Sequence, residues 1–174
     1  MSARYAELQV TSQFSFLRGA SSAEELFTRA AVLGIEALAI VDRNSLAGIV
    51  RAHEAARATG VRLIVGCRLD LADGMSVLVY PTDRPAYSRL CRLLSLGKRR
   101  AGKGRCHLDW SDLLAYGEGL IAVLVPDLAD AECGRRLRRL DGLGHEGVAQ
   151  VGGAPLGPLA HLIAPLVMVS RCWR

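Results

Sequence analysis

The feature that most constrains the fold is a short apolar run at residues 37–41, which Asp42 closes. A run of this length without polar alternation is typical of a strand covered on both faces, as in a parallel sheet. Ser22 and Glu25 form a capping-box pattern ahead of it, and Gly34 suits the end of the intervening helix. The sequence therefore predicts a helix that leads into a buried strand.

The same alternation extends in both directions along the chain. Residues 5–10 are expected to form a first strand, residues 45–58 a helix that ends at Gly60, and residues 61–65 a further strand. Strands that alternate with helices predict an α/β fold around a largely parallel sheet or barrel.

A hairpin signal interrupts this alternation. The dipeptide Asp73-Gly74 lies between two strand-like segments and favours their antiparallel pairing. Beyond it we expect a helix opened by Asp83, a short helix at residues 108–116 and a buried strand at residues 119–125.

The composition is that of a folded, reduced protein. The 174 residues fit one domain, 51% of them are hydrophobic, and the formal net charge of +5 is a mild excess that suits an anionic partner without requiring one. Five cysteines in no CxxC spacing, with no secretory signal, predict a cytoplasmic protein. The longest apolar run, residues 159–169, is too short to span a membrane.

Two segments carry a family resemblance. Residues 8–20 and 39–48 resemble the first two motifs of the polymerase and histidinol phosphatase (PHP) domain that begins the alpha subunit of bacterial DNA polymerase III. The amino acids in these motifs are most similar to those of the error-prone branch of the family. The resemblance implies an α/β fold that is part of a distorted (β/α)₇ barrel, incomplete at the C-terminus. We expect a PHP-like domain over residues 1–126. Residues 127–174, arginine-rich and then rich in glycine and proline, would be an atypical tail, truncated or out of frame.

The resemblance also identifies the positions of a metal site. Active PHP domains carry a His-x-His on the first strand, an Asp before a Gly, an Asp-His after the second strand and a Glu after the third. The matching positions here are Gln9, Thr11, Arg18, Asp42, Arg43 and Arg68. Only Asp42 remains a plausible ligand, because arginine stays cationic and has no lone pair to offer a cation. We therefore predict no bound metal and no hydrolase or nuclease activity, and we interpret Gln9 and Thr11 as ordinary strand residues.

The three arginines leave two interpretations open. If the resemblance holds, Arg18, Arg43 and Arg68 lie near one pocket at the carboxyl ends of the strands, where they replace the metals either as a structural plug or as an anion and phosphate site. Arg43 and Arg68 otherwise lie on the surface or pair with one of three carboxylates: Asp42, Asp70 or Glu7.

A second basic feature lies at residues 98–105, a glycine-rich segment expected to be an exposed loop. Its cations could contact the DNA backbone, or the loop is simply solvated: Lys98, Arg99, Arg100, Lys103 and Arg105. The few aromatic residues are expected in the core, with no interleaved aromatic and basic pattern for stacking single strands. The histidines show no ligand spacing.

These observations favour a segment of an error-prone DNA polymerase that serves DNA replication and translesion synthesis and itself lacks catalytic sites. The parent polymerase would use Mg²⁺, bind DNA and meet replication or translesion proteins, whereas this chain would need no cofactor and contact no membrane. The alternatives are a free-standing PHP-type metal-dependent phosphoesterase and an anion-binding domain.

Overall fold

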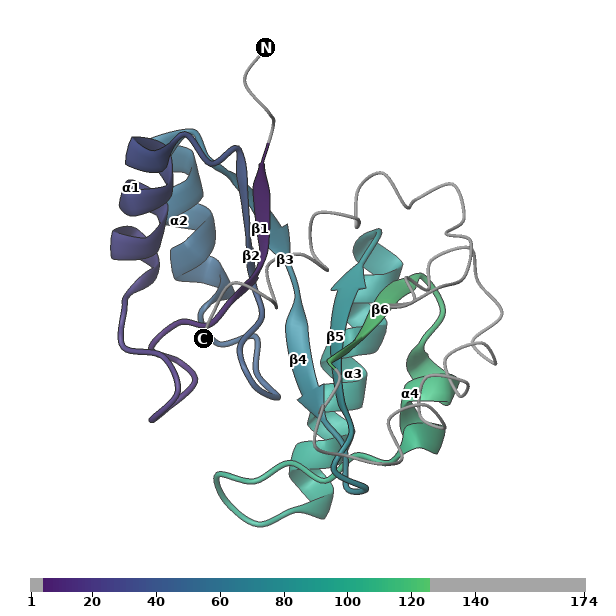
Figure 1. Ribbon diagram of the computed structural model, residues 1–174. Coiled ribbons are helices and arrows are strands. Elements are labelled where there is room, and N and C mark those ends of the chain that lie inside the picture. The colour runs from purple at the N-terminus through teal and green to yellow at the C-terminus, as the bar shows by residue number, and fades with distance from the viewer. Residues whose placement is uncertain (1–4, 126–174) are drawn as a thin grey trace.

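The computed structural model describes residues 5–125, which form two β-sheets with helices on their outer sides (Figure 1). The predicted tail at residues 127–174 lies outside the described residues. Strands and helices alternate through most of the described part, so the predicted α/β class is confirmed.

The first sheet is parallel, as predicted. It contains β1 (Ala6–Val10), β2 (Ala37–Ile40) and β3 (Arg62–Val65) in the order β1-β2-β3. Helices α1 (Ala23–Leu33) and α2 (Ile49–Thr59) connect these strands, and both cover the same face of the sheet (Figure 1).

The ends of these helices follow the sequence signals. The Ser22 hydroxyl accepts a hydrogen bond from the Glu25 amide, and the Glu25 carboxylate accepts one from the Ser22 amide, which completes the predicted capping box. Gly34 and Gly60 end the two helices in the left-handed conformation, at φ 70° and 77°. These glycines turn the chain directly into β2 and β3.

The second sheet is antiparallel. It contains β4 (Cys67–Asp70), β5 (Ser76–Pro81) and β6 (Leu120–Val125), and the predicted hairpin at Asp73-Gly74 joins the first two of these strands. The helices between β5 and β6 are α3 (Arg84–Arg100), capped by Asp83, and α4 (Trp110–Tyr116), capped by Asp109.

The two sheets pack against each other through their inner faces. In β2, Ile40 faces the core under α1 and α2, whereas Ala39 and the adjacent Val41 pack against Leu78 and Tyr80 of β5. Both faces of β2 are therefore buried, which explains why its sequence shows no polar alternation. The Tyr80 hydroxyl also donates a hydrogen bond of 2.7 Å to the Leu8 carbonyl and so ties the second sheet to β1.

The strands of residues 5–125 lie in two separate sheets, one parallel and one antiparallel, with no closed barrel among them. One detail differs from the sequence expectations. The basic loop is shorter than predicted, because residues 98–100 continue the last turn of α3, where cations interact favourably with the helix dipole. No helix in the described part is both long and apolar enough to cross a membrane.

Candidate functional site

The carboxyl ends of β2 and β4 each hold one carboxylate, and the candidate site is built around these two groups. The first is Asp42, two residues after the end of β2 and only 1% exposed. Its Oδ1 accepts hydrogen bonds from the Ser12 amide at 2.9 Å and the Ser15 hydroxyl at 2.7 Å, and its Oδ2 accepts one from the Ser12 hydroxyl at 2.7 Å. We call Asp42, Ser12 and Ser15 the Asp42 cluster, in which every donor is neutral.

Glycines allow the loop after β1 to fold over Asp42. A Cβ atom at Gly19 would lie 2.2 Å from the Ser12 carbonyl oxygen, which no real side chain tolerates. A Cβ atom at Gly48 would lie 2.8 Å from the Phe14 ring and 3.2 Å from Asp42 Oδ2. Both glycines therefore serve close packing against this loop, which positions the Ser12 and Ser15 hydroxyls.

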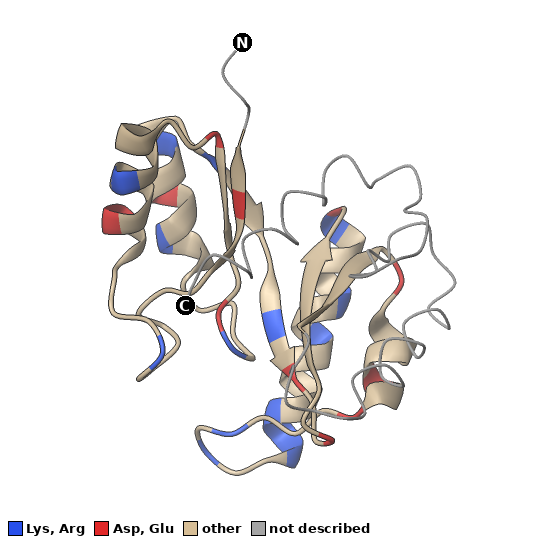
Figure 2. Cartoon of the chain, viewed as in Figure 1, with Lys and Arg blue, Asp and Glu red and all other residues tan. Residues whose placement is uncertain are grey.

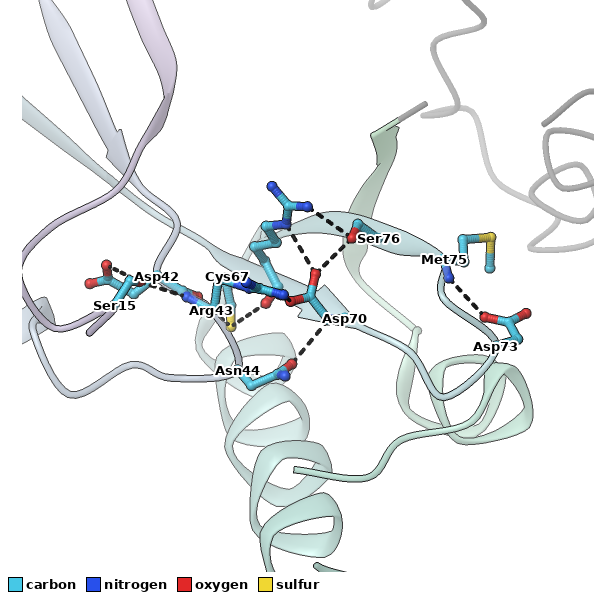
Figure 3. Close-up of polar contacts among 10 residues, drawn as sticks. Ser15, Asp42, Arg43, Asn44, Cys67, Asp70, Asp73, Met75 and Ser76 are labelled. Atoms are coloured by element: carbon cyan, nitrogen blue, oxygen red, sulfur yellow. Dashed lines mark hydrogen bonds and ion pairs between the residues drawn. The ribbon is translucent and has the colours of Figure 1, made fainter. Parts of the chain in front are cut away.

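The second carboxylate is Asp70, at the end of β4. Arg43 donates to its Oδ2 through both Nε and Nη2, and Arg68 Nε donates to its Oδ1 at 3.0 Å. The Ser76 hydroxyl donates to the same Oδ1 at 2.7 Å and accepts from Arg68 Nη2 at 3.0 Å. Figure 3 shows the Arg43 and Ser76 side chains beside Asp70, one from the segment after β2 and one from β5. We call Asp70, Arg43, Arg68 and Ser76 the Asp70 network.

Asn44 fixes the backbone around this network. It adopts a left-handed conformation at φ 48°, its amide donates to the Arg68 carbonyl at 2.8 Å, and its Oδ1 accepts from the Asp70 amide at 3.1 Å. The Arg68 amide donates in turn to the Asp42 carbonyl at 3.1 Å. The segments that follow β2 and β4 are thus locked together, and Arg43 and Arg68 are held side by side.

The electrostatics of the Asp70 network favour the charged carboxylate. Burial by itself raises the pKa of Asp70, but the hydrogen bonds from Ser76, Arg43 and Arg68 outweigh burial and hold this pKa below its ordinary value. Nearby Cys67 is different, because burial raises the pKa of its thiol to about 12, so it stays protonated at neutral pH. The network therefore holds an ionised carboxylate and no activated nucleophile.

These residues do not fit a divalent metal. All the hydrogen bonds to Asp42 occupy the two oxygens that would ligate a cation, and the groups around Asp70 are guanidinium cations, which repel one. Among residues 5–125, no group of three His, Cys, Asp or Glu side chains is arranged to hold a metal ion. The absence of a bound metal stays a prediction.

A cavity of about 700 Å³ opens beside the Asp70 network, and we call it the basic cavity. Four segments line it: the loop after β1, the segment after β2, the end of β4, and the end of α3 with the loop that follows. Its polar and aromatic lining residues are Phe14, Ser15, Phe16, Arg18, Arg43, Asn44, Ser45, Asp70, Lys98, Lys103 and Arg105. In Figure 2 the blue of Lys and Arg gathers along the lower edge of the view, at the end of α3 and the adjoining loops.

The loop after α3 is anchored against its helix. The amides of Ala101 and His107 both donate to the Gly97 carbonyl, at 3.3 and 3.0 Å. A Cβ atom at Gly97 would lie 2.6 Å from Cys106 Sγ and 2.7 Å from Leu108. Gly97 therefore lets the loop return closely along α3, which fixes the direction in which Lys103 faces the basic cavity.

The residues at the predicted family positions lie in different surroundings in the structure. Arg43 and Arg68 pair with Asp70, one of the three partners considered from the sequence. Arg18 lies in the exposed loop after β1 and lines the basic cavity together with Arg43. Gln9 is exposed on β1, and neither Gln9 nor Thr11 lines that cavity.

Only some of the cationic side chains of residues 98–105 line the basic cavity. Lys98, Lys103 and Arg105 line the basic cavity, whereas Arg99 is exposed and does not. Arg100 points elsewhere, because its Nη1 donates to Asp112 Oδ2 at 2.6 Å. Their contact with DNA stays a prediction.

Sequence reasoning missed the residues that complete the site. Ser12 and Ser15 lie in the first of the two family motifs, at residues 8–20, but had no role assigned from the sequence, although a serine hydroxyl is a donor that can satisfy Asp42. The expectation that the aromatic residues are core is wrong for Phe14 and Phe16, which are 37% and 84% exposed. The only hint in the sequence was that Phe14, Phe16 and Arg18 stand close together in one short segment, and this does not reveal their exposure.

The fold and this edge define an α/β domain whose polar groups gather at the carboxyl ends of the strands, with guanidinium groups where metal ligands are expected. The profile of the PHP domain family matches residues 7–150, and the chain belongs to this family.

Two error-prone DNA polymerases are similar to this chain in sequence. Error-prone DNA polymerase 1 of Agrobacterium fabrum is 72% identical over 137 residues, and the error-prone DNA polymerase of Caulobacter vibrioides is 58% identical over 123 residues. These matches cover 79% and 70% of this chain but only 13% and 11% of the relatives, so the chain spans a small part of their length.

Solved structures support the fold. A protein described as a metal-dependent phosphoesterase from Bifidobacterium adolescentis aligns over 97% of this chain and 84% of its own, with a TM-score of 0.62 and 15% identity. An amidohydrolase from Chromobacterium violaceum aligns over 82% of this chain and 75% of its own, with a TM-score of 0.59 and 18% identity. At these identities the likeness concerns the fold alone.

Proposed function

We propose that this chain is the N-terminal PHP segment of an error-prone DNA polymerase, in which the former hydrolase site has become a structural element. The Asp70 network carries the proposal. Two guanidinium groups and one carboxylate occupy the edge where active family members hold metals, and they tie the segment after β2 to β4. The module supports the polymerase body and catalyses no reaction of its own.

The barrel interpretation belongs to this proposal. The parallel β1-β2-β3 sheet with two covering helices corresponds to the first units of a distorted (β/α)₇ barrel, of which this chain carries a part. The match of the PHP domain family to residues 7–150 supports this assignment.

The remaining activity is assigned to the parent polymerase. It would add nucleotides to a primer with Mg²⁺, act in replication and in translesion synthesis past damaged DNA, and meet its protein partners there. The free-standing phosphoesterase alternative has no support from the site, because its nucleophile would be a metal-activated water and the donors present do not fit a metal.

The test is metal content and phosphodiesterase activity of the purified chain, with Mn²⁺ and Zn²⁺ in excess. We expect no stoichiometric metal after desalting and no hydrolysis of a phosphodiester substrate above the rate without protein. The matched variant is Asp42→Asn, which removes the one remaining family ligand. Bound metal with turnover, both lost in Asp42→Asn, would overturn the structural assignment and restore the hydrolase.

A further inference from the structure

We propose that the basic cavity binds a single strand of nucleic acid, with phosphates held by its cations and one base stacked on Phe16. This inference goes beyond the structural role proposed above and does not depend on it. The cavity touches the buried Asp42 cluster only at Ser15, and it shares only Arg43 and Asp70 with the Asp70 network.

The charge of the cavity suits a polyanion. Five cationic side chains line it, namely Arg18, Arg43, Lys98, Lys103 and Arg105, and the only lining carboxylate among residues 5–125 is Asp70. That carboxylate is already paired with Arg43 and Arg68. Phosphates that neutralise exposed cations release counterions, which drives association.

Most of these cations have no protein partner in the described part of the chain. Within residues 5–125, the carboxylate ion pairs engage Arg43 but none of Arg18, Lys98, Lys103 and Arg105. Those four side chains are exposed. A solvated cation that faces a cavity can exchange water for a phosphate oxygen without first breaking an internal ion pair.

The aromatic component comes from a distant part of the sequence. Phe16 is 84% exposed and Phe14 is 37% exposed, and both line the cavity opposite the basic loop that follows α3. An exposed ring beside cations is the arrangement by which proteins stack successive bases while tracking the backbone of a single strand. The fold thus assembles an aromatic and basic pattern that the linear sequence lacks.

The geometry favours a single strand over two other anions. In a duplex the base faces are covered by their neighbours, so Phe16 has no ring to stack on unless a base is flipped out. A lone phosphate would use at most a few of the five cations, which come from three separate segments, and would leave the aromatic side chains without a role. A single strand of nucleic acid would contact both the cations and the aromatic side chains.

Binding is measured by fluorescence anisotropy with the full chain, a labelled oligothymidylate of roughly 12 nucleotides and a series of salt concentrations. The charge variant is Lys103→Ala with Arg105→Ala. Its matched control is Arg57→Ala with Arg62→Ala, which removes two exposed arginines from α2 and β3 outside the cavity. We expect the charge variant to bind the strand about tenfold more weakly. The slope of the logarithm of the binding constant against the logarithm of the salt concentration should become less steep by about 0.7 for each phosphate that is no longer neutralised.

The stacking variant is Phe16→Ala, and Leu17→Ala is its matched control. Leu17 is the neighbouring residue and is 86% exposed, but it does not line the cavity. We expect Phe16→Ala to weaken binding of the single strand about tenfold and Leu17→Ala to leave it unchanged. Thermal melting of each variant checks that the fold is retained.

Three results would overturn the proposal. Equal or tighter binding of a duplex of the same length would show that no free base is read. Inorganic phosphate or a mononucleotide could displace the labelled strand as well as unlabelled strand does, when the two are compared at equal phosphate concentration. This result would show that the cavity is a simple anion site. Equal effects of the two cation pairs, or of Phe16→Ala and Leu17→Ala, would place binding outside the cavity.

Discussion

Asp42 and Asp70 lie near the ends of β2 and β4, on segments that the Arg43–Arg68 bridge brings together, yet the protein satisfies them in opposite ways. Asp42 is 1% exposed and takes all three of its hydrogen bonds from neutral groups of Ser12 and Ser15. Asp70 is only half-buried and takes its bonds from two guanidinium groups and a hydroxyl. One carboxylate is enclosed by a loop, whereas the other gathers cations at the rim of a cavity.

The difference shows two ways in which a carboxylate can serve as a structural acceptor. Asp42 stands at the position where the sequence resemblance predicts a metal ligand, and its oxygens hold the loop after β1 in place. The loop carries Phe16 and Arg18 to the basic cavity. Asp70 does the complementary work, because it keeps Arg43 and Arg68 from repelling each other. Each carboxylate is a structural acceptor.

The largest expected effect is that of Asp42→Ala. This change removes three hydrogen bonds in a site that solvent does not reach and leaves the Ser12 amide and both hydroxyls without their acceptor. We expect the free energy of unfolding to fall by about 4 kcal/mol, as measured by urea denaturation.

The control for Asp42→Ala is Glu54→Ala, which removes an exposed carboxylate on α2 and should change the free energy of unfolding by less than about 0.5 kcal/mol. Asp42→Asn keeps one oxygen acceptor and should lie between the two. If Asp42→Ala were as mild as Glu54→Ala, the loop after β1 would be held by other contacts.

The next largest effect is expected for Asp70→Asn, which keeps the shape but removes the charge between Arg43 and Arg68. Both arginines are about 30% exposed in their side chains and can turn toward water, so the loss should be about 2 kcal/mol. The measurement is again urea denaturation at neutral pH.

The pH dependence distinguishes this loss from a packing defect. Because the pKa of Asp70 is lowered in the folded protein, its ionisation stabilises the fold above the unfolded pKa of about 3.9, and this contribution disappears as pH falls through the folded pKa. The difference between wild type and Asp70→Asn should therefore be constant above about pH 5 and shrink below about pH 4. A difference that persists in acid would show that charge is not the cause.

The sequence predicted the elements of this fold better than their assembly. Local signals are strong where one dipeptide or cap decides the geometry, as at Asp73-Gly74 and the Ser22 cap. The arrangement in two sheets depends on side chains far apart in sequence, such as Val41 against Tyr80, and no local pattern encodes that contact. This is why the parallel unit was predicted and the packing of the two sheets was not.

The site shows the same division. The family positions identified Arg43 and Arg68, and the sequence offered Asp70 as one of three candidate partners. Choosing among the three required the hairpin, because Ser76 of β5 completes the carboxylate's surroundings. The basic cavity could not be predicted at all, since residues 14–18 and 98–105 meet only through the tertiary fold.

The smallest expected effect is the difference in the free energy of unfolding between alanine variants of two serines that make equivalent hydrogen bonds. Ser15 donates to Asp42 and accepts from the Arg43 amide, whereas Ser76 donates to Asp70 and accepts from the Arg68 guanidinium. Ser15 is 4% exposed although it lines the basic cavity, so water replaces its hydroxyl less easily than that of the half-buried Ser76. Ser15→Ala should therefore cost about 1 kcal/mol more than Ser76→Ala, measured side by side in urea. Equal costs would mean that the two carboxylates are equally shielded from solvent, and the contrast between the enclosed Asp42 cluster and the open Asp70 network would no longer hold.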